Sequence, residues 1–275
     1  MSAEPNLRVA AGAEERVHLA DLFHRINRLM PVDQQIVSVA PDTTVREALE
    51  KMREHSFSQL PVVEGREVLG LFSYRSLAAK LVEVDPKKHN PVEILVEEAM
   101  EIVDASSFVH INHEFRSIFD TLDMEDFVLV GEAGRLQGIV TAMDVLRYLY
   151  GVASPFMLIA EIELCVRALM RQAMSDEAIA EAAAVALTGY EKPENRPTQL
   201  EEMTFNDYVQ IVGDGRCWDK FRPVFGGNRD RTRARLKVVG ELRNEVFHFR
   251  RELTVEEHQT LSDARSWLLM RSRAV

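Results

Sequence analysis

The chain has 275 residues, of which 46% are apolar and 28% charged, and its formal net charge is −11. A chain of this length and composition is long enough for about two domains with separate cores and is neither disordered nor fibrous. The acidic balance excludes a protein that coats nucleic acid along its whole surface. Two cysteines, Cys165 and Cys217, are too few for a disulfide framework or a thiolate metal cage, so we expect reduced, structural thiols.

The sequence carries no targeting or membrane signal. Its N-terminus lacks a basic stretch followed by an apolar one. The most apolar window, residues 156–170, is interrupted by Glu161, Glu163 and Arg167, which the hydrocarbon core of a bilayer does not tolerate. These features predict a cytoplasmic protein with no membrane partner.

Residues 1–30 are expected to form a helical segment, and an internal repeat follows it. Residues 37–77 are echoed by residues 108–146, and each copy predicts a strand, an amphipathic helix, two strands across a turn and a final helix. The unit is β-α-β-β-α, so the first half is of the α+β class. The expected helix faces are Val45, Ala48, Leu49 and Met52 in the first copy and Phe115, Ile118, Phe119 and Leu122 in the second. The expected strands are residues 60–63, 68–72, 127–130 and 136–140.

This element order, together with the closing sequence GIVTAMD (residues 138–144), resembles the cystathionine beta-synthase (CBS) domain. Two copies in tandem resemble a Bateman module over residues 31–150. In that family a Gly-x-x-Thr/Ser-x-x-Asp ending places a hydroxyl near phosphate and a carboxylate on the ribose hydroxyls. The resemblance therefore implies an adenine nucleotide (ATP, ADP or AMP) as a regulatory ligand, bound between the copies.

The two copies differ at the residues that would bind the nucleotide. The second copy keeps the pattern as Gly138, Thr141 and Asp144. The first copy reads Gly70, Ser73 and Ser76, with serine where the carboxylate should be. We expect one good nucleotide site on the second copy and one degraded or empty site at Ser73. Alternatively, Thr141 and Asp144 only cap the last helix, because both are ordinary N-cap residues.

Beyond Pro155 the strand signals stop, and residues 151–275 predict an all-α bundle. Helix start signals stand at Ser175 and Thr204, and Thr254 with Glu257 forms a capping box. A long helix is expected from the glycine-rich turn at residues 225–228 through residue 253.

Residues 216–251 contain eleven basic and four acidic residues, so they carry +7 in a chain of net charge −11. Such a run is either a solvated helix face or a patch of positive potential. The expected core-facing stripe of this helix is Val239, Leu242, Val246, Phe249 and Leu253. Asn244 and His248 then lie one turn apart on the opposite face, where Gly240 would let another backbone approach. This pattern favours a helix–helix partner surface.

The sequence RNEVFH, which contains Arg243, Asn244 and His248, resembles the motif of the HEPN superfamily. Many members of that superfamily are metal-independent ribonucleases, toxins or antiviral effectors. In that family two protomers pack so that both copies of the motif line one cleft. Arg-x4-His alone is expected about once by chance in a chain of this composition, and the adjacent asparagine makes the match more specific. The resemblance implies a homodimer with RNA as substrate.

The residue types suit that chemistry. His248 would take the proton of the 2′-hydroxyl or protonate the leaving oxygen, and Arg243 would stabilise the pentavalent phosphate. Asn244 would orient His248 or bind phosphate, and no metal is expected. Alternatively, His248 is an exposed helix residue and Arg243 is a surface ion-pair partner of Glu245 or Glu241.

These features together predict a nucleotide-regulated, metal-independent endoribonuclease. The alternative is a non-catalytic ligand-sensing protein whose bundle mediates dimerisation or partner binding. A third function, regulation of an unrelated enzyme or transporter encoded nearby, is equally compatible with the sequence.

Overall fold

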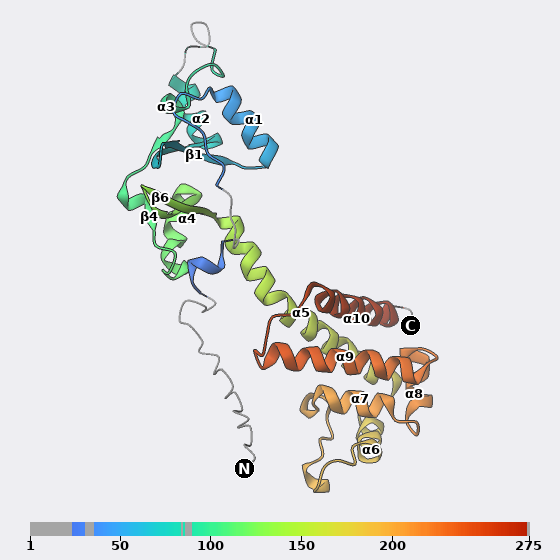
Figure 1. Ribbon diagram of the computed structural model, residues 1–275. Coiled ribbons are helices and arrows are strands. Elements are labelled where there is room, and N and C mark those ends of the chain that lie inside the picture. Colours follow the sequence, from blue (N-terminus) through green and yellow to red (C-terminus); the bar gives the residue numbers. More distant parts are fainter. Residues whose placement is uncertain (1–23, 31–35, 84, 86–89, 274–275) are drawn as a thin grey trace, which may run out of the picture. The chain divides into compact units, whose positions relative to one another are not determined.

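The computed structural model describes residues 24–30, 36–83, 85 and 90–273. It divides into two compact units, Met1–Tyr148 (unit 1) and Leu149–Val275 (unit 2) (Figure 1). Strands occur, among the described residues, only in unit 1. The expected order of an α+β part and a helical part is therefore observed. The expected N-terminal helical segment lies mostly outside the described residues, and its described end holds a short 3₁₀ helix, η2 (Ile26–Arg28).

The first half of unit 1 forms a three-stranded sheet in the order β1-β2-β3. Its elements are α1 (Val45–His55), β1 (Gln59–Glu64), β2 (Glu67–Ser73), α2 (Tyr74–Glu83), α3 (Val96–Ala99) and β3 (Glu101–Ile102). The predicted face of α1 is confirmed, because Val45, Ala48 and Met52 are fully buried. Gly70 is required in β2, because a Cβ there would lie 2.5 Å from the backbone oxygen of Glu101 in β3.

The second half of unit 1 has a sheet in the order β4-β5-β6, with β4 parallel to β5 and β6 antiparallel to it. Its elements are η3 (Ala105–Ser107), β4 (Phe108–Val109), η4 (Phe115–Ile118), α4 (Phe119–Glu125), β5 (Phe127–Glu132) and β6 (Arg135–Thr141). The predicted strands of this half are present. Its helix is split at Phe119, whose side chain is 42% exposed, so this part of the expected apolar face is not buried.

Helix α5 (Ala142–Ala173) begins in unit 1 and continues into unit 2 through Pro155. The domain boundary expected at residues 150–151 thus falls inside one continuous helix, although proline removes a backbone hydrogen bond there. Ile159, Ile162 and Val166 are fully buried in the core of unit 2. Their burial offsets the cost of the proline and keeps the segment helical.

Unit 2 contains only helices among its described residues. Besides α5 they are α6 (Asp176–Ala186), η5 (Pro193–Asn195), η6 (Leu200–Glu202), α7 (Phe205–Gly213), α8 (Trp218–Phe225), α9 (Arg229–Phe247) and α10 (Val255–Arg273). The start signals at Ser175, Thr204 and Thr254 are confirmed, because each hydroxyl oxygen accepts a hydrogen bond from the backbone N–H three residues on. Helix α8, which contains Pro223, is not anticipated from the sequence.

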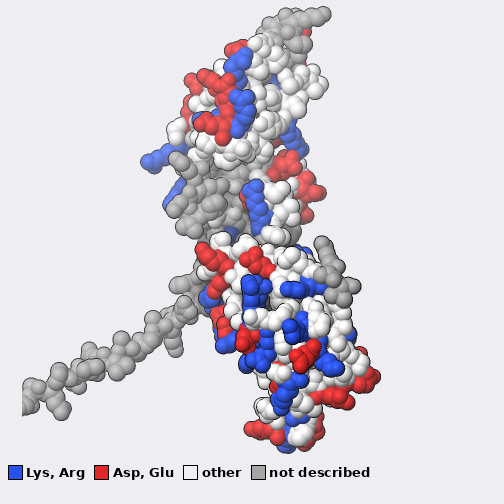
Figure 2. Space-filling model, turned by 90° about the vertical axis from the view of Figure 1, so that its right-hand side faces the viewer, with Lys and Arg blue, Asp and Glu red and all other residues white. Residues whose placement is uncertain are grey.

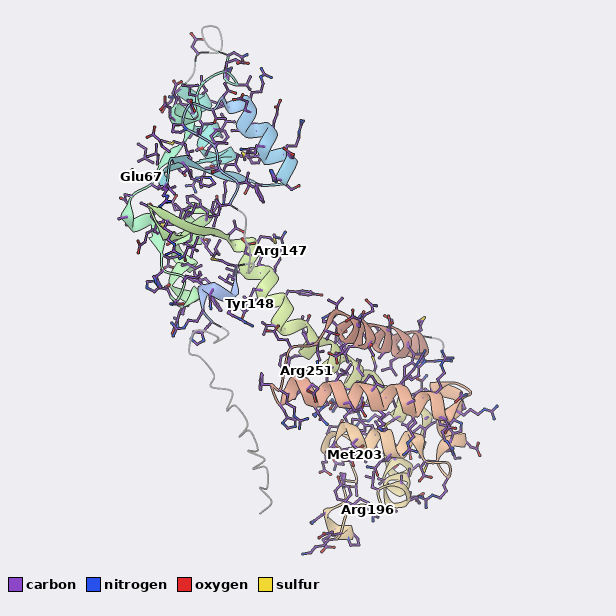
Figure 3. All side chains as sticks on the ribbon, in the orientation of Figure 1. Glu67, Arg147, Tyr148, Arg196, Met203 and Arg251 are labelled. Carbon is purple, nitrogen blue, oxygen red and sulfur yellow. The ribbon has the colours of Figure 1, made fainter. Side chains whose placement is uncertain are left out.

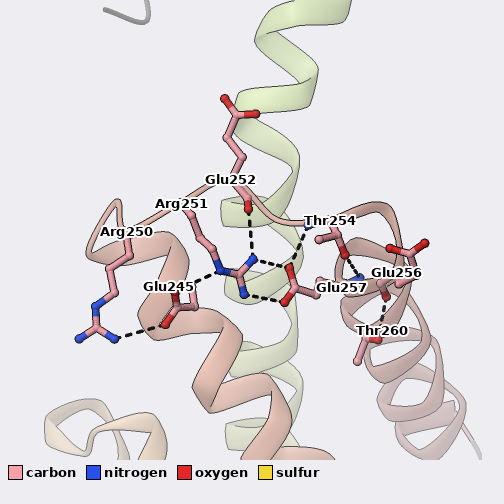
Figure 4. A network of polar contacts seen from close by, with 8 residues as sticks. All are labelled: Glu245, Arg250, Arg251, Glu252, Thr254, Glu256, Glu257 and Thr260. Carbon is pink, nitrogen blue, oxygen red and sulfur yellow. Dashed lines mark hydrogen bonds and ion pairs between the residues drawn. The ribbon is translucent and has the colours of Figure 1, made fainter. Parts of the chain in front are cut away.

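The sequence prediction for the end of α9 is wrong. The helix stops at Phe247, and Phe249 has φ of +52° and a side chain that is 70% exposed. An ionic network holds this turn: Arg251 lies 3.5 Å from Glu245 and donates two 2.6 Å hydrogen bonds to Glu257 at the start of α10 (Figure 4). His248 is thus the C-cap residue, and the helical face expected for His248 and Phe249 does not exist.

The structure also differs from the helix–helix partner surface that the sequence predicts at Gly240. A Cβ on Gly240 would lie 3.3 Å from the ring of Phe205, at the start of α7. The close neighbour that glycine admits is therefore a side chain of the same unit, where α7 packs against α9.

Candidate functional sites

Unit 1 contains a cavity of about 450 Å³ between its two halves. Thr141 and Asp144 line it, from the end of β6 and the first turn of α5. Most of the remaining lining comes from residues 36–37 and 55–61 and from the first turns of α5. The cavity therefore brings together two segments about a hundred residues apart in the sequence.

Thr141 and Asp144 form a reciprocal cap at the N-terminus of α5. The backbone N–H and the hydroxyl of Thr141 donate to Oδ2 of Asp144, over 2.9 and 2.6 Å. In return, the backbone N–H of Asp144 donates to Oγ1 of Thr141 over 3.3 Å. The capping alternative thus describes the local geometry. The cap uses Oδ2 of Asp144, and Oδ1 lies 3.8 Å from Arg147.

The equivalent position of the first half is a neutral cap. Ser73 and Ser76 exchange hydrogen bonds of 2.9 and 3.0 Å between each backbone N–H and the other hydroxyl. Both residues are buried, and neither Ser73 nor Gly138 is among the described residues that line the cavity. Gly138 lies in β6, paired with Val130. Of the four predicted binding residues, the structure therefore brings two to this cavity.

The rest of the lining suits a ligand with an apolar ring and an anionic group. Ile36, Val37 and Ile139 provide apolar surface, and the rings of His55 and Phe57 are stacked with centroids 5.5 Å apart. Arg147, labelled on α5 in Figure 3, adds an exposed guanidinium. Sequence reasoning missed these residues because they lie outside the repeated Gly-x-x-Thr-x-x-Asp pattern.

In unit 2, Arg243 is held on the inner side of α9. Its guanidinium lies 4.9 Å from the ring of Phe247, and its Nε is 3.8 Å from Oε2 of Glu163 on α5. That distance is too long for a hydrogen bond, and the buried Nε has no hydrogen-bond acceptor among the described residues. Glu241 and Glu245 are not its partners: they pair with Lys237 and with Arg250 and Arg251.

Arg243 and Asn244 line a second cavity, of about 370 Å³, between α7 and α9. Lys237, Thr204 and Asn206 contribute further polar groups to it. His248 is exposed at the end of α9 and is not among the described lining residues. The structure therefore brings Arg243 and Asn244 together at one cavity and places His248 beyond the helix end.

The positive charge of residues 216–251 is offset locally. Arg216 pairs with Asp214 at 2.7 Å, and Arg229 pairs with Asp230 at 3.0 Å. Figure 2 shows basic and acidic side chains interspersed over the lower part of the visible face.

Neither Cys165 nor Cys217 is among the described residues that line the two cavities. Burial raises the pKa of the Cys165 and Cys217 thiols, and both are free thiols. Across residues 24–30, 36–83, 85 and 90–273, no three His, Cys, Asp or Glu side chains are grouped so that they could hold a metal ion.

The chain was compared with known families and proteins. Residues 32–83 match the family model of the CBS domain. Inosine-5′-monophosphate dehydrogenase from Korarchaeum cryptofilum is 31% identical over 147 residues, which are 52% of this chain and 27% of that protein. A zinc metalloprotease from Methanocaldococcus jannaschii is 28% identical over 145 residues, 52% of this chain and 38% of that protein. The chain spans about a quarter of the dehydrogenases that it matches.

Among solved structures, a CBS-domain protein from Agrobacterium tumefaciens is 23% identical, with a TM-score of 0.39, and the match covers 45% of this chain and 96% of that one. A second, CBSX2 in complex with AMP, is 23% identical with a TM-score of 0.37, covering 45% of this chain and 94% of that one. The family-model match therefore lies in the first half of unit 1.

Proposed function

We propose that unit 1 binds an adenine nucleotide in the 450 Å³ cavity and that the second half of the unit is a second CBS domain. The single observation that carries this proposal is the position of Thr141 and Asp144 on a cavity lined from both halves. Small-molecule sites have volumes of about 300–1,000 Å³ and combine apolar walls with a few polar groups, as this cavity does.

Each group of the nucleotide has a counterpart in the lining. The apolar residues Ile36 and Ile139 and the stacked pair of His55 and Phe57 suit the base. Oδ1 of Asp144 is an acceptor for the ribose hydroxyls, and Arg147 with the N-terminus of α5 attracts phosphate. Because Ser76 replaces the carboxylate in the first half, we expect one nucleotide per chain.

The substitution Asp144→Asn tests this site. One amide oxygen can still accept the two hydrogen bonds from Thr141, so the cap of α5 persists. The amide nitrogen that replaces Oδ1 cannot accept from a ribose hydroxyl. We expect affinity for ATP, ADP or AMP to fall about 10- to 100-fold, since a hydrogen bond to a charged group contributes about 1.5–3 kcal/mol. Isothermal titration calorimetry measures both the affinity and the stoichiometry.

The matched control is Asp120→Asn, an exposed aspartate on α4 of the same unit, which should leave the affinity unchanged. Equal affinities of wild type and Asp144→Asn would remove Asp144 from the site. Two nucleotides per chain would contradict the single-site proposal.

We propose, as a second activity, that unit 2 cleaves RNA with Arg243, Asn244 and His248 and that the bound nucleotide regulates this cleavage. The supporting observation is that Arg243 and Asn244 line one cavity, with Lys237 beside them. The guanidinium of Arg243 would bind a phosphate oxygen there. The exposed His248 would transfer the proton, as an imidazole does near neutral pH.

This activity is tested by incubating the full chain with total RNA in EDTA, with and without ATP or AMP. RNA should be cleaved despite chelation, and His248→Ala should lower the rate about 10²- to 10⁴-fold, the usual contribution of a general acid or base. His113→Ala, an exposed histidine of unit 1, is the control. Intact RNA with the wild-type protein would favour the non-catalytic alternative, in which unit 2 binds a protein partner.

A further inference from the structure

The internal repeat relates the nucleotide cavity to a second place in unit 1. Thr141 pairs with Phe127 in the β5–β6 hairpin, and Ser73 pairs with Gln59 at the same register of the β1–β2 hairpin. Thr141 and the start of α5 line the cavity together with residues 55–61 of the first half. By the repeat, Ser73 and the start of α2 are the counterpart of the wall that contains Thr141.

The helix ends on the other side of each place correspond as well. Ser56 ends α1 and Asp126 ends α4, and both have a left-handed backbone, with φ of +57° and +64°. Ser56 lines the nucleotide cavity. The counterpart of that cavity therefore lies between residues 73–76 of the first half and residues 124–127 of the second, and we call it the second crossing.

Arg75 spans the second crossing. It lies in the first turn of α2, and its Nη1 donates a hydrogen bond to the backbone oxygen of Met124. The same nitrogen lies 3.7 Å from the carboxylate of Asp126 and 4.0 Å from that of Glu125. The equivalent residue of the second half is Met143, which lines the nucleotide cavity. One position of the repeat therefore holds a cavity-lining side chain in one place and a cation bonded across the other.

An apolar cluster also joins the two halves of unit 1. Val68 and Leu71 of β2 are buried together with Phe127 and Leu129 of β5. Apolar burial is non-directional, so it holds the halves together without fixing the angle between them. The hydrogen bond of Arg75 has a defined direction and restricts that angle. Because the cavity is lined from both halves, the angle determines the distance between its walls.

We propose that Arg75 is a positioning residue for the nucleotide, which holds the two walls of the cavity at their binding separation before the ligand arrives. This inference rests on the nucleotide site proposed above. Arg75 is not among the described residues that line the cavity, so it acts through the placement of the halves and not on the ligand. A cavity that is already formed binds more tightly, because the ligand does not have to order its walls.

The first test is Arg75→Met, which gives the second crossing the residue type that the second half has at this position. The dissociation constants of AMP and ATP should rise about 3- to 10-fold, because a half-exposed, charge-assisted hydrogen bond is lost. Surface plasmon resonance with the full chain immobilised should show a lower association rate constant and an unchanged dissociation rate constant, since the bound state keeps its contacts. In contrast, Asp144→Asn removes a ligand contact and should raise the dissociation rate constant.

The matched control is Arg46→Met, which removes an equally exposed arginine that pairs with Glu93 inside the first half, at 2.7 Å. It changes the net charge by the same amount and should leave both affinities within about twofold of wild type. Arg75→Lys keeps a charged donor for the oxygen of Met124 and should restore most of the affinity. Equal losses in Arg46→Met and Arg75→Met, or a loss in Arg75→Met that lies only in the dissociation rate, would overturn the proposal.

The second test needs no ligand. The backbone N–H of Val68 donates to the oxygen of Ala133 in the other half over 3.0 Å, so its exchange with solvent reports on the contact between the halves. In the full chain without nucleotide, Arg75→Met should speed the amide exchange of Val68 about 3- to 10-fold by NMR, and Arg46→Met should not. If wild type binds neither AMP nor ATP, the proposed nucleotide site fails and this exchange alone decides the role of Arg75. Unchanged exchange of Val68 in Arg75→Met would show that Arg75 does not hold the halves.

Discussion

At the scale of single residues, Asp144 combines a structural role with the binding role proposed for it. Oδ2 accepts both donors of Thr141, while Oδ1 lies 3.8 Å from Arg147. The Gly-x-x-Thr-x-x-Asp spacing predicts both roles from the sequence, since a Thr and an Asp three residues apart can cap a helix and also face its N-terminal end. The cap uses Oδ2, and the binding role proposed above uses Oδ1.

Arg251 is a second residue whose role depends on its surroundings. Hydrogen bonds from Arg251 and then from the backbone of Thr254 lower the pKa of Glu257 from 4.5 to about 2. A carboxyl whose pKa is lower in the folded state stabilises the fold fully above its unfolded value of 4.5, and this contribution is lost as the pH falls through about 2. The link between α9 and α10 should therefore loosen in that acidic window.

We predict that Arg251→Gln raises the pKa of Glu257 towards 4.5, because the two charge-assisted hydrogen bonds are removed. Carbon-detected NMR titration of the glutamate side chains measures this shift directly. Arg250→Gln is the control, because Arg250 bonds Glu245 of α9 rather than Glu257. A pKa of Glu257 that stays near 2 in Arg251→Gln would show that the Thr254 cap dominates.

At the scale of elements, the helix starts at Ser175, Thr204 and Thr254 follow from the sequence, whereas the end of α9 does not. Each N-terminal cap is a contact over three residues, as between Thr204 and Asp207 or Thr254 and Glu257. The end of α9 depends instead on Arg251 reaching Glu257 of the next helix. The apolar spacing through Phe249 and Leu253 continues past that end, so periodicity alone extends the helix too far.

The N-terminus of α7 forms one wall of the cavity beside Arg243, and Asp207 holds it. Asp207 is 3% exposed, and its Oδ2 accepts from the backbone and hydroxyl of Thr204 and from the hydroxyl of Tyr190, over 2.8, 2.8 and 3.0 Å. We predict that Asp207→Ala lowers the free energy of unfolding by about 2–3 kcal/mol, because a cap is lost and polar groups near the core lose their acceptor.

Urea denaturation followed by tryptophan fluorescence measures this loss. The control is Asp219→Ala, an exposed aspartate in the first turn of α8, which should cost less than about 0.5 kcal/mol. Similar losses in the two variants would show that the hydrogen bonds of Asp207 are not the cause.

At the scale of the whole molecule, regulation requires that a ligand of unit 1 affects unit 2. A ligand shifts an equilibrium only through its different affinity for the two states. Helix α5 is the covalent element that runs from one unit into the other. The two tryptophans, Trp218 and Trp267, both lie in unit 2, so their fluorescence reports on that unit alone.

We predict that ATP or AMP at 100 times its dissociation constant stabilises unit 1 by about 2.7 kcal/mol. If the units are coupled, the tryptophan-detected melting temperature of unit 2 rises as well. Thermal unfolding followed by circular dichroism and by fluorescence separates the two effects, and Asp144→Asn should abolish both. If the tryptophan-detected melting temperature does not change when the nucleotide is added, this coupling of the units is ruled out.

The sequence by itself determined the local features of this protein: the repeated order of strands and helices, the buried face of α1, the caps at Ser175, Thr204 and Thr254, and the Thr141–Asp144 pair. These features depend on contacts within about four residues, which periodicity and capping rules describe. The family match at residues 32–83 agrees with the first copy of that repeat.

Only the tertiary structure decided the continuation of α5 through Pro155, the end of α9, the pairing of Arg243 with Glu163, and the cavity between residues 36–61 and 139–147. Each of these joins residues of different elements, most of them far apart in the sequence. Their energies come from burial and charge pairing across the fold, which local spacing does not encode.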